Sequence, residues 1–556
     1  MSHPLFDKHL AVFRQAMAAV ENRVYWSPFP ENPALLGEAA AEDARQAFEA
    51  YRDASFYLDQ PGVVGRGGTE VSPYGLPLNI SYPVCNPDAL ILAARGGLAP
   101  WVKAGPETRA GLCLEILFRL KQHGLELAHA AMHTTGQSFA FAFQHSVAHA
   151  LDRGLEAVAS AYREMKQVPA RAVWEKPQGA GRTTLRLDKT YRVVPRGIDL
   201  VVSNPLSPTW NAFPAIFASL ATGNPVIVKP HPSAILPLAI SVAAARMTLK
   251  EEGFDPGLIS LLVDDETDAV ARIAALRPEI RLIDVTGSGE LVRWLKENAH
   301  QAVVFAQQPG TNCVIVDSTM DYKGMLRNLA ISLCLYSGQL AAAPRLLLVS
   351  REGVRTPDGV VPAEQFARDM VFAIGRLLED PLRAVEILGC VQSADAAGRI
   401  AALREDYGIV RDSSPVVHPQ WPGARMHTPL LLRLESGEEL GWTEGGAAPV
   451  AALLETATVS ESLAMAERIM AERGALAFAV HSTNAHVVEL AEDAALRSGV
   501  ALSLNLTGAA LMNQPAAFAD FLGTGANRAA SCSFTDAAFV TPRFSIAQTQ
   551  AMGTPP

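Results

Sequence analysis

Apolar residues follow two different spacings along the chain. Residues 109–131 are predicted to form an amphipathic helix, because apolar side chains recur every three or four positions, at Leu112, Ile116, Leu117, Leu120, Leu125 and Leu127. Helical spacing of this kind dominates the first third. From about residue 165, the segments AVWEKPQ and TTLRLDKTYRVVPRG alternate apolar and polar positions, which predicts a half-exposed β-hairpin. We expect this hairpin to leave the body of its domain.

Short apolar runs then alternate with helical patterns. The runs GIDLVVSNP, PVIVKPHP, LISLLVDD and IRLIDVTGSG are separated by helical stretches such as AFPAIFASLATGN, in which we expect a helix over 213–221. This alternation predicts a parallel sheet covered on both faces. A second alternation, from QAVVFAQQPGTNCVIVD to ALSLNLTG, predicts a second α/β domain. Because ligands bind beyond the C-terminal ends of parallel strands, we expect functional residues there.

Composition and charge exclude several classes of function. The chain has 556 residues, 49% of them hydrophobic, which is enough for two or more domains with large cores. A net charge of −10 gives no overall field that attracts nucleic acid or anionic membranes. The six cysteines form no metal-ligand spacing, so we expect no metal site and a reducing, cytoplasmic environment. The start, MSHPLFDKHLAVFRQ, has no signal-peptide pattern, and we expect no membrane span.

Two strand ends carry residues that suit a nucleotide. Lys229 closes the run PVIVK, and TGSGE at 286–290 follows a later strand. The glycines would let backbone N–H groups approach phosphate, and Lys229 can donate to a ribose or a phosphate. A solvated lysine and a chance glycine motif explain these residues equally well.

Several motifs that occur in a fixed order along the chain identify a protein family more specifically than any one of them alone. W-N-x-F-P, A-T-G-N-x-V-x-x-K-P, T-G-S-x-E, G-x-N-x-V-I-V and S-G-Q-x-x-x-A-P together resemble the aldehyde dehydrogenase superfamily. HTTGQSFAFA at 133–142 and the late segments NLTGAALMNQ and GTGANRAAS extend the resemblance over nearly the whole chain. KPHPSAILPLAISV, YSGQ and the C-terminal tail resemble the PaaN-type aldehyde dehydrogenases of phenylacetic acid degradation.

The resemblance implies a domain organisation. The expected fold is α/β, with a Rossmann-like cofactor domain, an α/β catalytic domain and a bridging hairpin used in oligomerisation. The expected limits are 1–169 for a helical N-terminal part of the cofactor domain, 170–194 for the hairpin, 195–305 for the Rossmann-like part, 306–530 for the catalytic domain and 531–556 for a C-terminal bridging segment. The resemblance also implies that the chain assembles into a homodimer or homotetramer through this hairpin.

The resemblance also assigns candidate site residues. In this family a cysteine thiolate attacks the aldehyde, hydride passes to a nicotinamide, and the thioester is released by water or by another thiol. Asn211 would stabilise the oxyanion, although ignoring the family it is equally well a turn residue that caps the following helix. Gln307 occupies the general-base position, and a glutamine accepts no proton from water. The expected cofactor contacts are Thr209, Trp210, Lys229, His231, Thr286, Gly287, Ser288 and Glu444, the last in EGGAAPV, which departs from the family's E-x-F-G-P-V.

The position of the nucleophile holds an alanine. Family members carry cysteine two residues after Gly-Gln, whereas Gly338 and Gln339 are followed here by Leu340 and Ala341. The interval from Gln307 matches the family's interval, and a methyl group forms no thiohemiacetal. Cys334, expected about two helical turns before Ala341, and Cys313, in an apolar strand, are interpreted as core residues. Three explanations compete for Ala341: an engineered replacement, which we favour, a natural loss of activity, or a misalignment.

The expected parent activity is NAD(P)-dependent oxidation of an aldehyde. The PaaN-type resemblance implies a semialdehyde derived from ring cleavage, possibly as a coenzyme A thioester. NADP is favoured over NAD, because Lys229 is followed by Pro230, His231 and Pro232 and not by the glutamate that binds the ribose in many NAD-specific relatives. The alternative is a catalytically inactive protein that binds nucleotide or a coenzyme A ester.

Overall fold

Helices form most of the first third of the protein. The computed structural model describes residues 3–179, 183–266, 268–443, 449–519 and 521–553. The helices of this part are α1 (Pro4–Asn22), η1 (Pro33–Leu36), α2 (Glu38–Glu49), α3 (Pro87–Gln122), α4 (Gly124–Thr135), α5 (Phe139–Phe141), the π-helix η2 (Ala142–His149) and α6 (Ala150–Met165). The single amphipathic helix expected over 109–131 was wrong, because His123 separates α3 from α4 and α3 is buried continuously from Arg109 to Leu117.

A five-stranded parallel sheet follows, in the order β7-β6-β5-β8-β9. Its strands are β5 (Ile198–Val202), β6 (Val226–Lys229), β7 (Ile259–Leu261), β8 (Ile280–Thr286) and β9 (Val303–Gln307), connected through α7 (Pro208–Thr222), α8 (Leu236–Glu251), η4 (Pro256–Leu258), α9 (Ala269–Ala275) and α10 (Gly289–Asn298). The strand order turns back at β5 and β8, which places the ligand crevice of such a sheet between their C-terminal ends. This sheet extends to Gln307, two residues beyond the limit expected from the sequence.

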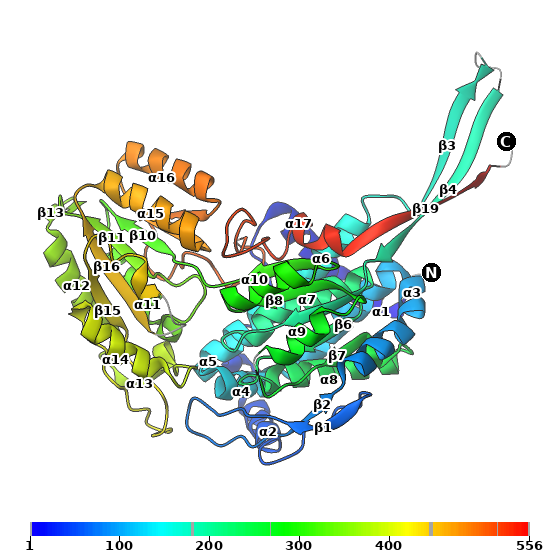
Figure 1. Ribbon diagram of the computed structural model, residues 1–556, viewed down its shortest axis with the longest axis horizontal. Coiled ribbons are helices and arrows are strands. Elements are labelled where there is room, and N and C mark those ends of the chain that lie inside the picture. Colours follow the sequence, from blue (N-terminus) through cyan, green and yellow to red (C-terminus); the bar gives the residue numbers. More distant parts are fainter. Residues whose placement is uncertain (1–2, 180–182, 267, 444–448, 520, 554–556) are drawn as a thin grey trace.

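The second sheet has seven strands in the order β14-β15-β16-β11-β10-β17-β18 (Figure 1). These are β10 (Cys313–Val316), β11 (Leu346–Ser350), β14 (Gly408–Arg411), β15 (Leu430–Leu434), β16 (Val450–Thr456), β17 (Ala477–His481) and β18 (Ala501–Leu504). All pairs are parallel except β14 with β15. The helices of this part are α11 (Tyr322–Cys334), η5 (Leu335–Gly338), α12 (Ala363–Leu377), α13 (Pro381–Leu388), α14 (Ala396–Asp406), η6 (Gly441–Thr443), α15 (Val459–Arg473) and α16 (Ala485–Ser498). Two α/β domains are therefore present.

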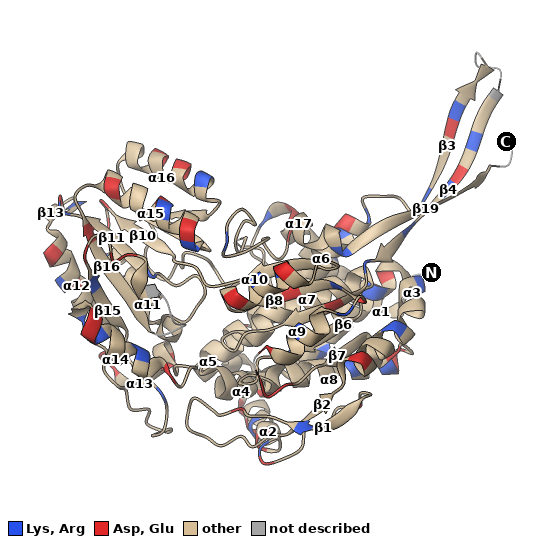
Figure 2. Cartoon of the chain, viewed as in Figure 1, with Lys and Arg blue, Asp and Glu red and all other residues tan. Residues whose placement is uncertain are grey.

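A three-stranded sheet projects from the first domain (Figure 1). β3 (Arg171–Gln178) and β4 (Thr183–Pro195) form the hairpin, and the C-terminal strand β19 (Phe544–Met552) pairs with β4 on its other side. Basic and acidic residues are interspersed along β3 and β4 (Figure 2), whereas β19 carries no charged residue. β4 is the central strand of this sheet, and the outer strands are β3 and β19.

The C-terminal segment is anchored by a buried arginine. Helices α17 (Ala537–Val540) and η7 (Thr541–Arg543) lead into β19. The Arg543 guanidinium donates to Asp199 Oδ2 at 3.0 Å and to the two carboxylate oxygens of Asp284 at 2.7 and 2.8 Å. Asp199 lies on β5 and Asp284 on β8, so Arg543 connects the end of the chain to the centre of the five-stranded sheet.

Two small hairpins complete the strands, β1 (Val63–Gly67) with β2 (Tyr82–Cys85) and β12 (Val354–Thr356) with β13 (Gly359–Val361). Among the described residues, no helix combines the length and apolar character that a bilayer crossing requires.

Candidate active site

A cavity of about 670 Å³ lies where the C-terminal ends of β5, β8 and β9 meet the second domain. The first domain contributes the loop after β5, the start of α7, and the residues after β6, β8 and β9. The second domain contributes Gln339, Ala341, Arg345, Arg399, Trp442 and Val450. The volume is within the range of small-molecule and cofactor sites, about 300–1,000 Å³.

Asn211 faces this cavity from the first turn of α7. The helix begins at Pro208, with Ser207 at the N-cap position, and the Asn211 N–H donates to Ser207 O at 3.1 Å. The expected start at Phe213 was therefore wrong, and Asn211 does not cap the helix. Within the described part of the chain, the Asn211 carboxamide makes no hydrogen bond, so it is available to a ligand oxygen.

The turn after β8 presents a helix N-terminus to the cavity. Thr286, Gly287 and Ser288 all line it, and Ser288 Oγ caps α10 by accepting from the Leu291 N–H at 3.2 Å. The N-terminal N–H groups of a helix carry a partial positive charge and bind phosphate groups readily. These residues fit the phosphates of a dinucleotide.

Three ionisable residues lie near the adjacent strand end. Lys229 is fully buried, donates to Glu266 O at 3.4 Å and is not part of the cavity lining, and burial lowers its pKa to about 8. His231 lines the cavity, but burial and the charge of Lys229 lower its pKa to about 4, so it is neutral at neutral pH. Asp268 also lines the cavity. His231 therefore adds no positive charge to the cavity at neutral pH, whereas Asp268 places a carboxyl group on its wall.

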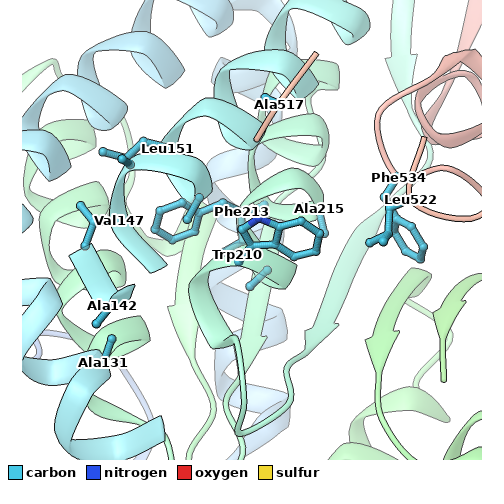
Figure 3. Packing of buried hydrophobic residues seen from close by; sticks show 14 of the residues in the cluster. Ala131, Ala142, Val147, Leu151, Trp210, Phe213, Ala215, Ala517, Leu522 and Phe534 are labelled. Atoms are coloured by element: carbon cyan, nitrogen blue, oxygen red, sulfur yellow. The ribbon is translucent and has the colours of Figure 1, made fainter. Parts of the chain in front are cut away.

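Thr209 and Trp210 do not line the large cavity. The Thr209 hydroxyl donates to Ser146 O at 2.6 Å, and Trp210 Nε1 donates to Pro515 O at 2.8 Å. Figure 3 shows Trp210 near Phe213 on the same helix, with Val147 and Leu151 on the neighbouring helices η2 and α6. Glu444 lies outside the described residues.

The segment before Ala341 has an unusual backbone. Tyr336 and Ser337 both have φ of 50°, and Gly338 has φ of 63°. Left-handed conformations are unfavourable for residues other than glycine, so this turn is held by its surroundings. Tyr336 Oη donates to Thr135 O at 2.5 Å, and Ser337 Oγ donates to Leu388 O at 3.1 Å.

Ala341 borders two cavities. It lines the large cavity and a second one of about 50 Å³, which is also lined by His145, Trp210, Ser332 and Asn513. α11 ends at Cys334, so the expectation that Cys334 and residue 341 share a helix was wrong. Ala341 is thus a residue at which the large cavity meets a smaller, mostly apolar one.

No thiol lines either cavity in the described part of the chain. All six cysteines are buried, and burial raises the pKa of Cys313 and of Cys334 to about 12. Gln307 lines the large cavity at the end of β9, and its carboxamide makes no hydrogen bond to a described residue. Position 307 therefore offers a polar group but no base.

Three residues near the site were absent from the sequence prediction: Ser207, Asp268 and His145. The dipeptide Ser207-Pro208 is a typical N-cap and first-turn pair, and it signals the true start of α7. The sequence gives no comparable signal for His145, because its proximity to Ala341 depends on tertiary packing.

Comparison with known proteins gives the family. The model of the aldehyde dehydrogenase family matches residues 86–408. An NAD-dependent aldehyde dehydrogenase from Burkholderia multivorans is 46% identical, with 100% of both chains covered and a TM-score of 0.97. A 1-pyrroline-5-carboxylate dehydrogenase from Thermus with bound NAD is 17% identical over 95% of this chain and 100% of that one, with a TM-score of 0.72.

A putative methylmalonate-semialdehyde dehydrogenase from Sinorhizobium meliloti, complexed with NAD, is 15% identical over 89% of this chain and 96% of that one, with a TM-score of 0.67. No curated protein matched the chain. The family model covers more than half of the chain, and the Burkholderia structure covers all of it at 46% identity. The chain belongs to the aldehyde dehydrogenase family.

Proposed function

We propose that the large cavity binds NAD and an aldehyde, and that it is the site of an NAD-dependent aldehyde dehydrogenase whose nucleophile position is alanine in this chain. The observation that carries the proposal is the convergence of the β8–α10 turn, Asn211 and Ala341 on one cavity. The 46%-identical Burkholderia enzyme, described as NAD-dependent, supports it.

The residues of the chain divide the work between binding and chemistry. The helix terminus at 287–289 would hold the phosphates, and the Asn211 carboxamide would donate to the carbonyl oxygen as charge develops on it. When bound, the nicotinamide supplies the hydride acceptor. Ala341 stands where a thiol would attack, and Gln307 stands where a base would deprotonate water, so the cysteine route is absent from this chain. The second candidate is an inactive protein that binds nucleotide or a coenzyme A ester. The alanine at position 341 and the glutamine at position 307 together favour this second candidate.

NAD is the proposed cofactor in preference to NADP. Asp268 lies on the cavity wall together with His231, which is neutral at neutral pH. A carboxylate there repels a 2'-phosphate and accepts hydrogen bonds from ribose hydroxyls.

A semialdehyde of the kind used by PaaN-type enzymes, possibly linked to coenzyme A, is the proposed substrate class. A groove of about 640 Å³ adjoins the large cavity and shares Gly289, Gln308, Pro309 and Gly310 with it. Four basic and two acidic side chains line this groove: Arg293, Lys296, Arg473, Arg528, Glu297 and Glu472. A local excess of positive charge on a chain of net charge −10 supports binding of a phosphate-bearing tail.

Assembly into a homodimer or homotetramer is proposed from the projecting sheet, whose outer strands β3 and β19 have open edges. A cytoplasmic location is proposed because all six cysteines are free.

Ala341→Cys tests the proposed activity. We expect the variant to reduce NAD in a rapid burst with its aldehyde, followed by slow turnover, because Gln307 does not activate water for release of the acyl group. Adding Gln307→Glu should speed the slow phase by about 10²–10⁴-fold, the usual contribution of a general base. Stopped-flow absorbance with a panel of semialdehydes and their coenzyme A esters measures both phases.

The unmodified chain and Ala341→Ser are the controls for the burst. A cysteine variant that binds NAD and substrate but gives no burst with any aldehyde contradicts the proposed activity and leaves the binding protein as the function.

A further inference from the structure

A serine on the wall of the large cavity forms a hydrogen-bonded pair with a buried histidine that lines the neighbouring small cavity. Ser207 Oγ and His145 Nε2 are 2.9 Å apart. Ser207 lines the cavity and keeps 8% of its surface exposed. A serine at an N-cap position normally accepts from the N–H groups of its own helix. The Ser207 hydroxyl makes no such bond and is hydrogen-bonded to the imidazole instead. In this arrangement, His145 Nε2 can accept the proton of the serine hydroxyl.

The imidazole of His145 is fixed in orientation by stacking. Phe141 lies against one face, with a centroid distance of 5.1 Å and an interplanar angle of 7°, and Trp210 stacks on it at 5.4 Å and 15°. His145 is 3% exposed, its Nδ1 has no hydrogen-bond partner, and the residue lines the small cavity beside Ala341. The tautomer protonated at Nδ1 leaves the Nε2 lone pair for the Ser207 hydroxyl proton.

A donor for an oxyanion lies one helical turn from the serine. Residues four apart share a face of a helix, and Ser207 and Asn211 occupy such positions at the start of α7. Both line the same cavity, and the Asn211 carboxamide makes no hydrogen bond to a described residue. A carbonyl carbon bound to Ser207 Oγ would therefore have an amide donor on the same side of the cavity, and the positive end of the α7 dipole beside it.

We propose that Ser207 and His145 are a nucleophile and its base, and that they catalyse hydrolysis of activated acyl compounds, namely thioesters or esters of short acyl groups. Ser207 Oγ forms a bond to the acyl carbon while His145 Nε2 takes its proton, and Asn211 donates to the resulting oxyanion. The carbon–sulfur or carbon–oxygen bond then breaks, and the leaving group receives the proton from His145. Water attacks the acyl-serine with His145 again as base, which releases the acid and restores the serine. Each cycle consumes one water and needs no oxidant.

Covalent labelling of the unmodified chain is the first test. The chain is incubated with 4-nitrophenyl acetate and, separately, with the thioester S-acetyl-N-acetylcysteamine, quenched in acid and mapped by peptide mass spectrometry. We expect acetylation of Ser207 with both probes. Acetyl groups found only on surface lysines, or no acetylation, would overturn the proposal.

Variants separate this pair from a general effect on folding. Ser207→Ala and His145→Gln should each lower kcat/KM for the thioester by at least about 100-fold, the lower limit of a general-base effect. Ser146→Ala and His149→Gln are matched controls, because both residues lie on η2, the helix that carries His145, and line neither cavity. The Ser146 hydroxyl, like that of Ser207, has one side-chain partner, Gln137 Oε1 at 2.8 Å. Equal hydrolysis by Ser207→Ala and the unmodified chain would refute the assignment.

Nucleotide binding is measured independently by titrating NAD against intrinsic tryptophan fluorescence. Acetylation of Ser207 without NAD binding would disprove the proposed dehydrogenase site and support hydrolysis by Ser207 and His145. NAD binding without acetylation would support the dehydrogenase site and disprove the hydrolysis. Thermal melting of each variant identifies any that fails to fold, and in that case the labelling of the unmodified chain decides.

Discussion

At the scale of single residues, electrostatics near the cavity differ from what the letters alone indicate. From the sequence, His231 after the strand-end Lys229 could carry a positive charge when protonated. Burial and the charge of Lys229 lower its pKa to about 4, so it is neutral at neutral pH. The carboxylate on the cavity wall comes from Asp268, which is far along the chain and reaches the site through the fold. Motifs of adjacent residues, such as Thr286-Gly287-Ser288, were found from the sequence because their proximity to one another is local.

Asp268→Asn tests the assignment of cofactor preference. We expect the unmodified chain to bind NAD at least about tenfold more tightly than NADP, since 1.4 kcal/mol of repulsion gives that factor. The neutral amide should narrow this ratio mainly by strengthening NADP binding. Fluorescence titration with both nucleotides measures it, with Asp265→Asn, an exposed residue outside the cavity lining, as the control. Equal affinities in the unmodified chain would contradict the assignment.

Glu70 gives a prediction about pH and stability. Its side chain is fully buried, accepts from the Leu236 N–H at 2.9 Å and from the Tyr82 hydroxyl, and burial raises its pKa to about 7. The folded state therefore holds this proton to higher pH than the unfolded state, and stability is lost as the pH rises from about 4.5 to above 7. The loss is on the order of 3 kcal/mol, because one pKa unit corresponds to about 1.4 kcal/mol.

Glu70→Gln should remove this contribution. We expect the melting temperature of the unmodified chain to fall more between pH 5 and pH 8 than that of the variant, with other groups cancelling in the comparison. Parallel melting curves for both proteins across this range would be inconsistent with a proton on Glu70.

At the scale of elements, periodicity predicted the strands well and the helices less well. β6, β8 and β10 end at the residues where the apolar runs end, because a buried parallel strand is a short continuous apolar segment. The start of α7 was placed too late because the apolar pattern becomes clear only at Phe213, whereas Ser207 and Pro208 define the first turn. The break at His123 has no strong signal, since apolar residues continue through both helices.

The anchoring of β19 is tested by Arg543→Met. The substitution leaves Asp199 and Asp284 buried without their counter-charge, which should cost about 3–5 kcal/mol. Arg186→Met in β4 is the matched control, because its contact with Glu175 lies at the surface and should contribute less than about 1 kcal/mol. Thermal unfolding of both variants measures the difference, and equal melting temperatures would show that Arg543 is not an anchor.

At the scale of the whole molecule, the two α/β domains and the projecting hairpin were predicted from the order of the motifs and the change of period. Functional residues were expected beyond the C-terminal ends of the parallel strands, and the large cavity lies at the ends of β5, β8 and β9. The resemblance predicted a bridging segment at 531–556, but no local pattern relates β19 to β4, which precedes it by most of the chain, so their pairing and register were not predicted.

Assembly is the prediction at this scale. We expect more than one subunit in solution at micromolar concentration, because β3 and β19 leave backbone groups at open edges. Sedimentation velocity measures the mass directly. Val173→Lys, at an exposed position of β3, should shift the population toward monomer, with Val360→Lys on β13 as the control. Only monomer in the unmodified chain would contradict the expectation.

The position of Arg543 also constrains the order in which the protein acquires its structure during synthesis. Asp199 and Asp284 leave the ribosome long before Arg543, which is 259 residues beyond Asp284. Until Arg543 arrives, the centre of the five-stranded sheet has two carboxylates and no counter-charge, and packing them in the interior is strongly unfavourable. The first α/β domain, although translated first, is therefore completed last, because its central strands gain their counter-charge only when the C-terminal segment has been synthesised.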